Sequence, residues 1–444
     1  MVISILAIFI LGYLAITFEH ALKIDKLIPA LLMMACTWGL LLMNSEAITF
    51  WLDPNNIELI NVIPNFMGAK SALIESTLLH HFGKTAEILI FLIGAMAIVE
   101  IIDYFDGFSV IQKWIQTKNK VKILWIIAAI GFFLSALIDN LTATIVLITI
   151  LRKIVTEKET RLYFIGLIII AANAGGAWSP IGDITTTMLW IAGKVSALPL
   201  VINTFLPALV CLLVPLSIIS FSPALKGNIN VAFAKESTPK ATLMVFIGLI
   251  LLLLVPISKI VFHLPPYMGM MLSLALFSLI AEIVSKRKFT MQLNETEESN
   301  AIPGPTKKAL TKIEIPSVLF FLGILMTIAA MESSGMILNF GTSVAQSISD
   351  KSFIVLLGLA SSVIDNVPLV AASIGMFQFP SDSNLWHLIA YTAGTGGSIL
   401  LIGSAAGVVA MGMENISFIW YLKNISWIAI IGYFAGIGVF LILH

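Results

Sequence analysis

The chain has 444 residues, of which 59% are hydrophobic and 11% charged, and its formal net charge is zero. Ordinary soluble proteins carry about 25% charged residues, so this composition excludes that class, and the absent basic excess gives no sign of nucleic-acid binding. The two cysteines, Cys36 and Cys211, lie in apolar runs, which argues against a disulfide framework. The sequence therefore predicts an all-α polytopic membrane protein in contact with the lipid bilayer.

Twelve apolar elements follow one another along the chain when about 20 apolar residues are taken as one membrane crossing. The first lacks the basic region and cleavage site of a signal peptide, so we expect it to be retained. Two long polar stretches, 45–85 and 286–312, are expected to be solvated loops. The twelve elements are 2–19, 27–44, 86–105, 122–151, 161–195, 199–222, 241–262, 267–285, 316–340, 352–378, 387–412 and 422–443.

The fourth and tenth elements each carry an Asp-Asn pair inside an apolar run, in "SALIDNLTATIVL" and "SSVIDNVPLVAA". A straight helix over 122–151 would be roughly 45 Å long with a carboxylate near its middle. Broken at Asp139-Asn140, it becomes two arms of roughly 20 Å, too short to cross. We therefore expect 122–151 and 352–378 to be re-entrant hairpins, whose tips lie inside the protein where irregular backbone is tolerated.

Charge distribution fits ten crossings and two hairpins with both termini outside. Basic residues favour the cytoplasmic side of a membrane, and this arrangement leaves all but five of the 25 Lys and Arg residues there. We expect the cell (inner) membrane as the location. The five external basic residues are Lys70, Lys84, Lys194, Lys259 and Lys351.

The chain divides into two halves, 1–222 and 241–444, joined by a predicted cytoplasmic linker at 223–240. Each half holds five crossings and one hairpin, and five is odd, so the second half is expected to be inverted. "ANAGGAWSPIGD" in 161–195 aligns without a gap onto "AGTGGSILLIGS" in 387–412. Inverted repeats with broken helices at matching places are typical of secondary transporters with a site near the midplane.

Both aligned segments are expected to unwind, because glycine costs about 1 kcal/mol and proline about 3 kcal/mol in a helix relative to alanine. Unwinding frees backbone groups to face a ligand. The polar residues around the first break are Asn173, Ser179, Asp183, Thr185 and Thr186, whereas the second copy has Ser404 opposite Asp183.

The segments "IDNLTAT", "NAGGAWSPIGDITTT" and "IDNVPLVAA" resemble the NhaD-type sodium/proton antiporters of the ion transporter superfamily over nearly the whole chain. The resemblance implies a homodimer of the elevator type, in which a transport part moves against a scaffold part. The chain begins directly with an outside N-terminus, so the leading helix of some relatives is expected to be absent. The resemblance also implies a cation and proton site, with Na⁺ held at Asp139, Asp183 and Asp365 and with Glu100 as a possible proton relay. The further expected site residues are Asn140, Thr142, Asn173, Thr185, Ser361 and Asn366.

Residue chemistry separately favours a small cation as the cargo. Carboxylates inside a membrane are costly and mark ion or proton pathways. No basic residue of the apolar elements is expected to pair with Asp139, Asp183 or Asp365. A carboxylate holds either a proton or a cation, so exchange of Na⁺, or Li⁺, for H⁺ follows from competition. The expected function is antiport without a cofactor and without enzymatic chemistry.

Several other interpretations stay open. Helix N-termini attract anions, so an anion carrier of the same superfamily, for dicarboxylate, citrate or arsenite, is the main alternative. An intramembrane aspartyl protease would also bury two aspartates, but "SPIGD" has the wrong glycine spacing for its motif. The tip aspartates and asparagines could serve only as helix caps and backbone partners. Glu100 and Asp103 could form a solvated helix face, and His80-His81 an exposed pair.

Overall fold

The computed structural model describes residues 2–17, 22–44, 50–52, 59–61, 69–112, 115, 117–229, 238–285, 304–345, 347–414 and 416–444. Strands β1 (Phe50–Leu52) and β2 (Leu59–Asn61) pair antiparallel, with Phe50 opposite Asn61. All other elements are helices. They are α1 (Val2–Thr17), α3 (Leu27–Met43), α4 (Ala69–Tyr104), α5 (Ser109–Gln112), α6 (Lys120–Ile138), α7 (Asn140–Ile154), α8 (Lys158–Gly176), α9 (Ile184–Ile191), α10 (Ala197–Ser220), η2 (Pro223–Leu225), α11 (Pro239–Phe262), α12 (Pro266–Val284), α13 (Pro305–Leu310), α14 (Ile315–Ser333), α15 (Met336–Ala345), α16 (Asp350–Ala360), α17 (Asn366–Met376), α18 (Asn384–Gly396), α19 (Ala405–Glu414), α20 (Phe418–Tyr421), η3 (Leu422–Ser426) and α21 (Trp427–Leu443).

Seven of the described helices are long and apolar enough to cross a membrane: α4, α6, α10, α11, α12, α14 and the continuous run from α20 to α21. Several shorter apolar helices accompany them, including α1, α3, α7, α17 and α19. Helix is the natural structure for these segments, because it satisfies every backbone polar group internally where no water is present. The prediction of a helical, multi-pass membrane fold is confirmed.

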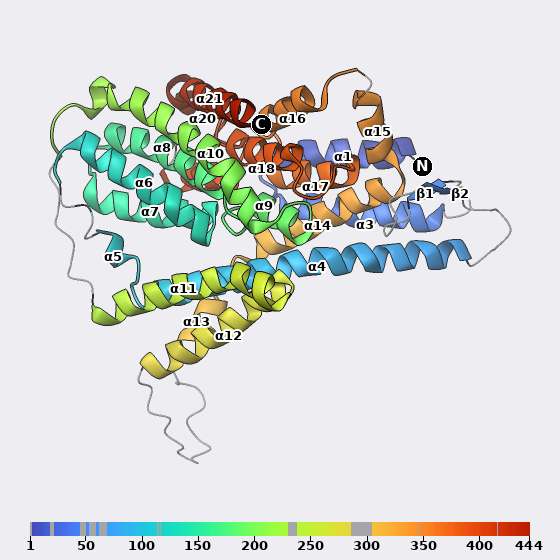
Figure 1. The fold of residues 1–444 in the computed structure, drawn as a ribbon, viewed down its shortest axis with the longest axis horizontal. Helices are drawn as coiled ribbons and strands as arrows, with labels where there is room; N and C mark the ends of the chain where they lie inside the picture. The colour runs from blue at the N-terminus through green and yellow to red at the C-terminus, as the bar shows by residue number, and fades with distance from the viewer. Residues whose placement is uncertain are drawn as a thin grey trace, which may run out of the picture.

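The helices pack into two groups. The α4 group contains α1, α3, α4, α11, α12, α13 and α14, and the α8 group contains α6 to α10 and α16 to α21. In Figure 1, α6, α7, α8 and α10 lie above α4, α11 and α12. Trp38 of α3 donates to the Met326 carbonyl of α14 inside the first group, and Tyr391 of α18 donates to the Tyr433 carbonyl of α21 inside the second. Each group is thus held by its own buried contacts.

Helices α6 and α7 form a hairpin with its tip at Asp139. This residue has a φ of 117°, which ends α6 and turns the chain into α7. The two open ends meet, because Lys120 at the start of α6 lies 2.6 Å from Glu157 just beyond α7. The α6 arm is longer than predicted: its 19 residues span about 28 Å, enough to cross a hydrocarbon core.

Helices α16 and α17 also reverse the chain, and the tip lies at 361–365. Phe353 near the start of α16 and Phe377 just after α17 have ring centroids 5.9 Å apart, so the open ends meet here too. Asp365 caps α17. Both Asp-Asn pairs therefore stand at hairpin tips, with the aspartate before the second arm and the asparagine as its first residue.

Two helices of the α8 group are interrupted at the glycine-rich segments. Helix α8 ends at Gly176 and α9 begins at Ile184, while α18 ends at Gly396 and α19 begins at Ala405.

Polar contacts join the elements of the α8 group at both of its ends. Glu414 at the end of α19 pairs with Arg152 of α7 at 2.5 Å and with Arg161 of α8 at 2.9 Å.

The opposite end is tied by Asp382, whose carboxylate accepts the Ser196 backbone N–H at 2.6 Å. This aspartate follows the second hairpin, and Ser196 precedes α10. The end of α19 is therefore bonded to α7 and α8, and the loop after the second hairpin is bonded to the segment between α9 and α10.

Three expected boundaries were wrong. The stretch 45–85 is not a loop throughout, because α4 begins at Ala69 and contains His80 and His81, the second of which contacts Ser333 of α14. The predicted element 316–340 is two helices, α14 and α15, separated at Gly335, where φ is 73°. The stretch 286–312 is not a loop throughout either, because α13 occupies Pro305–Leu310 and buries Pro305 and Ala309; residues 286–303 lie outside the described residues.

Candidate functional site

Four helices begin at the centre of the α8 group, and each begins with a polar cap. Asp139, Asp183 and Asp365 cap α7, α9 and α17 through their carboxylates. Ser404 precedes α19, and its hydroxyl accepts the Gly407 N–H at 3.3 Å. A capping oxygen satisfies one of the free N–H groups at a helix start and contributes about 1 kcal/mol. The three predicted aspartates, at the two tips and the first helix break, therefore share one structural role with Ser404 at the second helix break.

Asp139 makes the most complete cap. Its carboxylate accepts the Thr142 N–H at 2.7 Å and the Thr142 hydroxyl at 2.8 Å. Thr142 thus donates two hydrogen bonds to the Asp139 carboxylate. The side chain of Asp139 is half-buried.

Asp183 and Asn366 connect the two halves of the chain. The Asn366 amide donates to the Asp183 carboxylate at 3.0 Å, and both side chains are buried. Gly394 of α18 lies against the same carboxylate, since a Cβ there would be 3.5 Å from Asp183 Oδ2. Asp183 is therefore enclosed by the second hairpin tip and by the second broken helix.

Asn140, Asn173 and Ser404 form a neutral chain of hydrogen bonds beside this pair. Asn140 donates to Asn173 at 3.2 Å, and Asn173 donates to Ser404 at 3.0 Å. The first tip, the first broken helix and the second broken helix are joined by these contacts.

Thr185 carries a hydroxyl suited to a ligand. It is fully buried beside the Asp183 carboxylate, with which its hydroxyl interacts. The first turn of α9 thus presents a carboxylate together with an adjacent hydroxyl oxygen.

Asp365 stands at the border between the two helix groups. It lies within electrostatic range of Asp183 on its own side and of Tyr13 and Lys26 from α1 and the start of α3. The ammonium of Lys26 also lies 4.8 Å from the centre of the Phe320 ring. The second tip therefore has charged and polar neighbours in the α4 group, which the sequence did not reveal.

Close backbone contact explains the paired glycines. A Cβ on Gly175 would collide with the Phe132 carbonyl of α6, and a Cβ on Gly396 would collide with the Gly358 carbonyl of α16. Each glycine thus lets a broken helix approach the first arm of a hairpin.

The remaining predicted residues lie apart from this centre. Ser361 is buried and donates to the Ala393 carbonyl at 2.8 Å. Glu100 lies 3.4 Å from Lys312, which hydrogen-bonds Asp103 at 2.8 Å. That hydrogen bond is the main reason why the pKa of Lys312 is raised. Glu100 thus belongs to an ion-pair cluster beyond the site.

The three aspartates are not gathered around one point. Within the described residues, no three acidic, histidine or cysteine side chains form a group that could hold a metal ion. A cation at Asp183 would instead take mixed oxygen ligands. Sequence reasoning gave Ser404 no role, although the alignment of the two broken helices had placed it opposite Asp183.

Comparisons with known proteins agree on the class of transporter. A family model described as citrate transporter matches residues 13–386. The chain is 38% identical to sodium/proton antiporter 1 of Arabidopsis thaliana over 100% of its own length and 72% of that protein. It is 30% identical to the Na⁺/H⁺ antiporter NhaD of Alkalimonas amylolytica, covering 99% and 90% of the two chains.

A solved structure shares the fold. The crystal structure of the YdaH transporter of Alcanivorax borkumensis, described as having an unusual topology, matches with a TM-score of 0.57 at 13% identity over 92% of this chain and 98% of that one. Together with the family match and the antiporter relatives, this establishes a non-enzymatic membrane transporter. The chain belongs to the citrate transporter family and, within it, to the NhaD-type antiporters that its Asp-Asn tips resemble.

Proposed function

We propose that this protein exchanges Na⁺ for H⁺ at a site centred on Asp183. The observation that carries the proposal is the buried carboxylate of Asp183, held by Asn366 of the other half at 3.0 Å and flanked by the buried Thr185 hydroxyl. Carboxylate, amide and hydroxyl oxygens suit a hard alkali cation. The antiporter names of the relatives support the same cargo.

A charge balance supports a cation rather than an anion. The N-terminus of α9 carries roughly half a positive charge, and the Asp183 carboxylate that caps it carries one negative charge. The hydrogen-bond partner of this carboxylate, Asn366, is neutral, whereas the nearby Lys26 acts on Asp365 at the border of the α4 group. Asp183 is thus left with an excess of negative charge, which one Na⁺ or one proton neutralises. Binding of either therefore excludes the other, and exchange follows.

The anion alternative is weaker for a geometric reason. An anion carrier uses the free N–H groups of helix starts. Here the N–H groups of Thr142, Thr185 and Val367 already face the protein's own carboxylates at 2.7, 3.5 and 3.2 Å. A dicarboxylate would have to displace these groups and tolerate their charge. The family description as citrate transporter keeps citrate as the compound to test.

For the architecture, we propose two inverted halves, 1–222 and 241–444, around the linker 223–240. Matching contacts support this relation. Ser135 donates to the Ala172 carbonyl at 2.6 Å, and Ser361 donates to the Ala393 carbonyl at 2.8 Å. The glycine contacts Gly175–Phe132 and Gly396–Gly358 form a second matching pair. The α8 group is then the moving part and the α4 group the scaffold of an elevator-type homodimer.

The proposed site is tested by charge removal. Asp139→Asn, Asp183→Asn and Asp365→Asn keep side-chain volume and a capping oxygen but remove the charge for which Na⁺ and H⁺ compete. Each should abolish sodium-driven proton flux in proteoliposomes at near-normal protein levels. Glu75→Gln, an exposed acid on α4, is the control and should transport normally. Full antiport in all three aspartate variants would reduce these residues to helix caps.

A further inference from the structure

A cavity of about 270 Å³ lies between the two helix groups, at the far ends of the helices that begin at the site. Its walls come from α4 and α14 on one side and from α9 and α17 on the other. Helices α9 and α17 begin at Asp183 and Asp365 and end here, at Ile191 and Met376. A helix of eight residues spans about 12 Å, so the cavity lies one short helix away from the proposed site.

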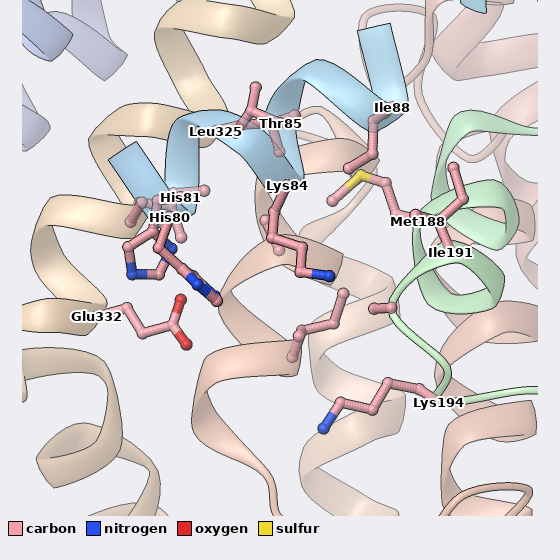
Figure 2. Close-up of a pocket in the computed structure, with 15 residues that line it drawn as sticks. His80, His81, Lys84, Thr85, Ile88, Met188, Ile191, Lys194, Leu325 and Glu332 are labelled. Atoms are coloured by element: carbon pink, nitrogen blue, oxygen red, sulfur yellow. The ribbon is translucent and has the colours of Figure 1, made fainter. Parts of the chain in front are cut away.

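Five side chains that can carry charge line this cavity: His80, His81, Lys84, Lys194 and Glu332. Figure 2 shows Glu332 and Lys194 extending into the same space from opposite sides. Lys84 and Lys194 outnumber the single carboxylate, so the cavity is a poor resting site for a cation. Its notable feature is instead one acid and one base that belong to different helix groups.

Glu332 is fixed to the α4 group. It stands at the end of α14, where the neighbouring Ser333 hydroxyl lies 3.2 Å from the His81 ring on α4. Helix α17 passes this carboxylate at Gly375, because a Cβ there would be only 2.8 Å from Glu332 Cδ. The boundary between the groups therefore runs directly past Glu332.

Lys194 is fixed to the α8 group. Its carbonyl accepts the Asp382 N–H at 2.9 Å, the adjacent Gly193 carbonyl accepts the Ser381 hydroxyl at 2.7 Å, and its ammonium lies 5.2 Å from the Trp386 ring centre. Lys194 must therefore move whenever α9 and α18 move.

We propose that Lys194 and Glu332 form a charge latch that closes this cavity when the α8 group moves along the α4 group. The two charges interact electrostatically. Among the described residues, however, neither takes part in an ion pair within 4 Å. The present structure is thus the unlatched arrangement. The proposal rests on the proposed transport function, because that function requires the two groups to move.

Cysteine crosslinking tests the latch without reference to the cargo. Lys194→Cys and Glu332→Cys are combined in a background lacking Cys36 and Cys211, and membranes are treated with an oxidant. A disulfide requires Cα atoms within about 7 Å, so we expect it to form as the cavity closes. We expect a disulfide that stops flux and is reversed by reductant. Lys84→Cys with Glu332→Cys is the matched control, because both residues belong to the α4 group and a bis-maleimide should join them equally with or without Na⁺.

Charge reversal provides a second measurement. Lys194→Glu and Glu332→Lys should each lower the flux rate about tenfold, which is about 1.4 kcal/mol in the barrier, and the double reversal should recover most of the rate. A missing disulfide, or one that leaves flux unchanged, would overturn the latch. A disulfide that forms in a protein without sodium-driven proton flux would instead overturn the proposed cargo and leave the latch standing.

Discussion

Replacing Asn366 by alanine tests the contact between the two halves at the site. The Asn366 amide donates to the charged Asp183 at 3.0 Å, and both side chains are buried. A hydrogen bond to a charged group contributes about 1.5 to 3 kcal/mol, and 1.4 kcal/mol is a factor of ten in affinity. Asn366→Ala should therefore weaken apparent Na⁺ affinity roughly 10- to 100-fold.

Asn140→Ala is the matched comparison. It removes the same group, but its partner is the neutral Asn173 at 3.2 Å, and a neutral hydrogen bond is worth about 0.5 to 1.5 kcal/mol. Its loss in affinity should be roughly two- to tenfold.

Sodium titration of proton flux in proteoliposomes, with thermal unfolding as a check on folding, measures both variants. The bond from Asn366 favours the ionised carboxylate, so its loss favours the protonated one. The defect of Asn366→Ala should therefore be larger at acidic than at alkaline pH. Equal losses in the two variants, or a larger loss in Asn140→Ala, would refute the assignment of Asp183 as the charged centre.

Three further predictions concern the frame around the site. Gly175→Ala and Gly396→Ala should abolish flux, because a Cβ would collide with the carbonyls of Phe132 and Gly358. Gly412→Ala should leave flux unchanged in the same assay, because a Cβ there would meet no atom of another described element within 4 Å. Glu414→Gln should lower the free energy of unfolding in detergent by about 2 kcal/mol, since it leaves two arginines without their partner. Arg152→Gln should cost less, because Arg152 is nearly half-exposed, and a larger loss in Arg152→Gln would show that Glu414 does not hold the end of α19 through both ion pairs. Finally, the hydrogen bond from Lys120 lowers the pKa of Glu157 below its usual 4.5, so this pair stabilises the fold above that value and loses its effect as pH falls through the lowered pKa. Thermal unfolding of the wild type and Glu157→Gln should converge at acidic pH, and a constant difference would show that the ion pair is not responsible.

Local chemistry explains what the sequence could predict. Polar Asp-Asn pairs inside apolar runs and adjacent glycines are poor for continuous helix, and the chain does break at Asp139, at 177–183, at 361–365 and at 397–404. These breaks depend on short-range preferences, so a single sequence contains them. The equivalent placement of Asp139 and Asp365 before the second arms follows from the same local pattern.

Contacts between distant segments explain what the sequence could not predict. The bond between Asp183 and Asn366 joins residues 183 positions apart, and nothing in either neighbourhood indicates the partner. The same holds for Lys120, which is buried against Glu157 and Thr160 rather than free in a loop. The sequence predicts an exposed loop position for His81, because the polar run 45–85 gives no sign that α4 already begins at Ala69.

Exchange of Na⁺ for H⁺ at Asp183 can be measured as flux in liposomes. The purified protein is reconstituted into liposomes with a pH-sensitive dye inside, and Na⁺ is added outside. We expect proton movement opposite to Na⁺ in the wild type, none in Asp183→Asn, and no uptake of labelled citrate in either. Citrate uptake by a wild type whose internal pH does not respond to Na⁺ would show that the cargo is an anion.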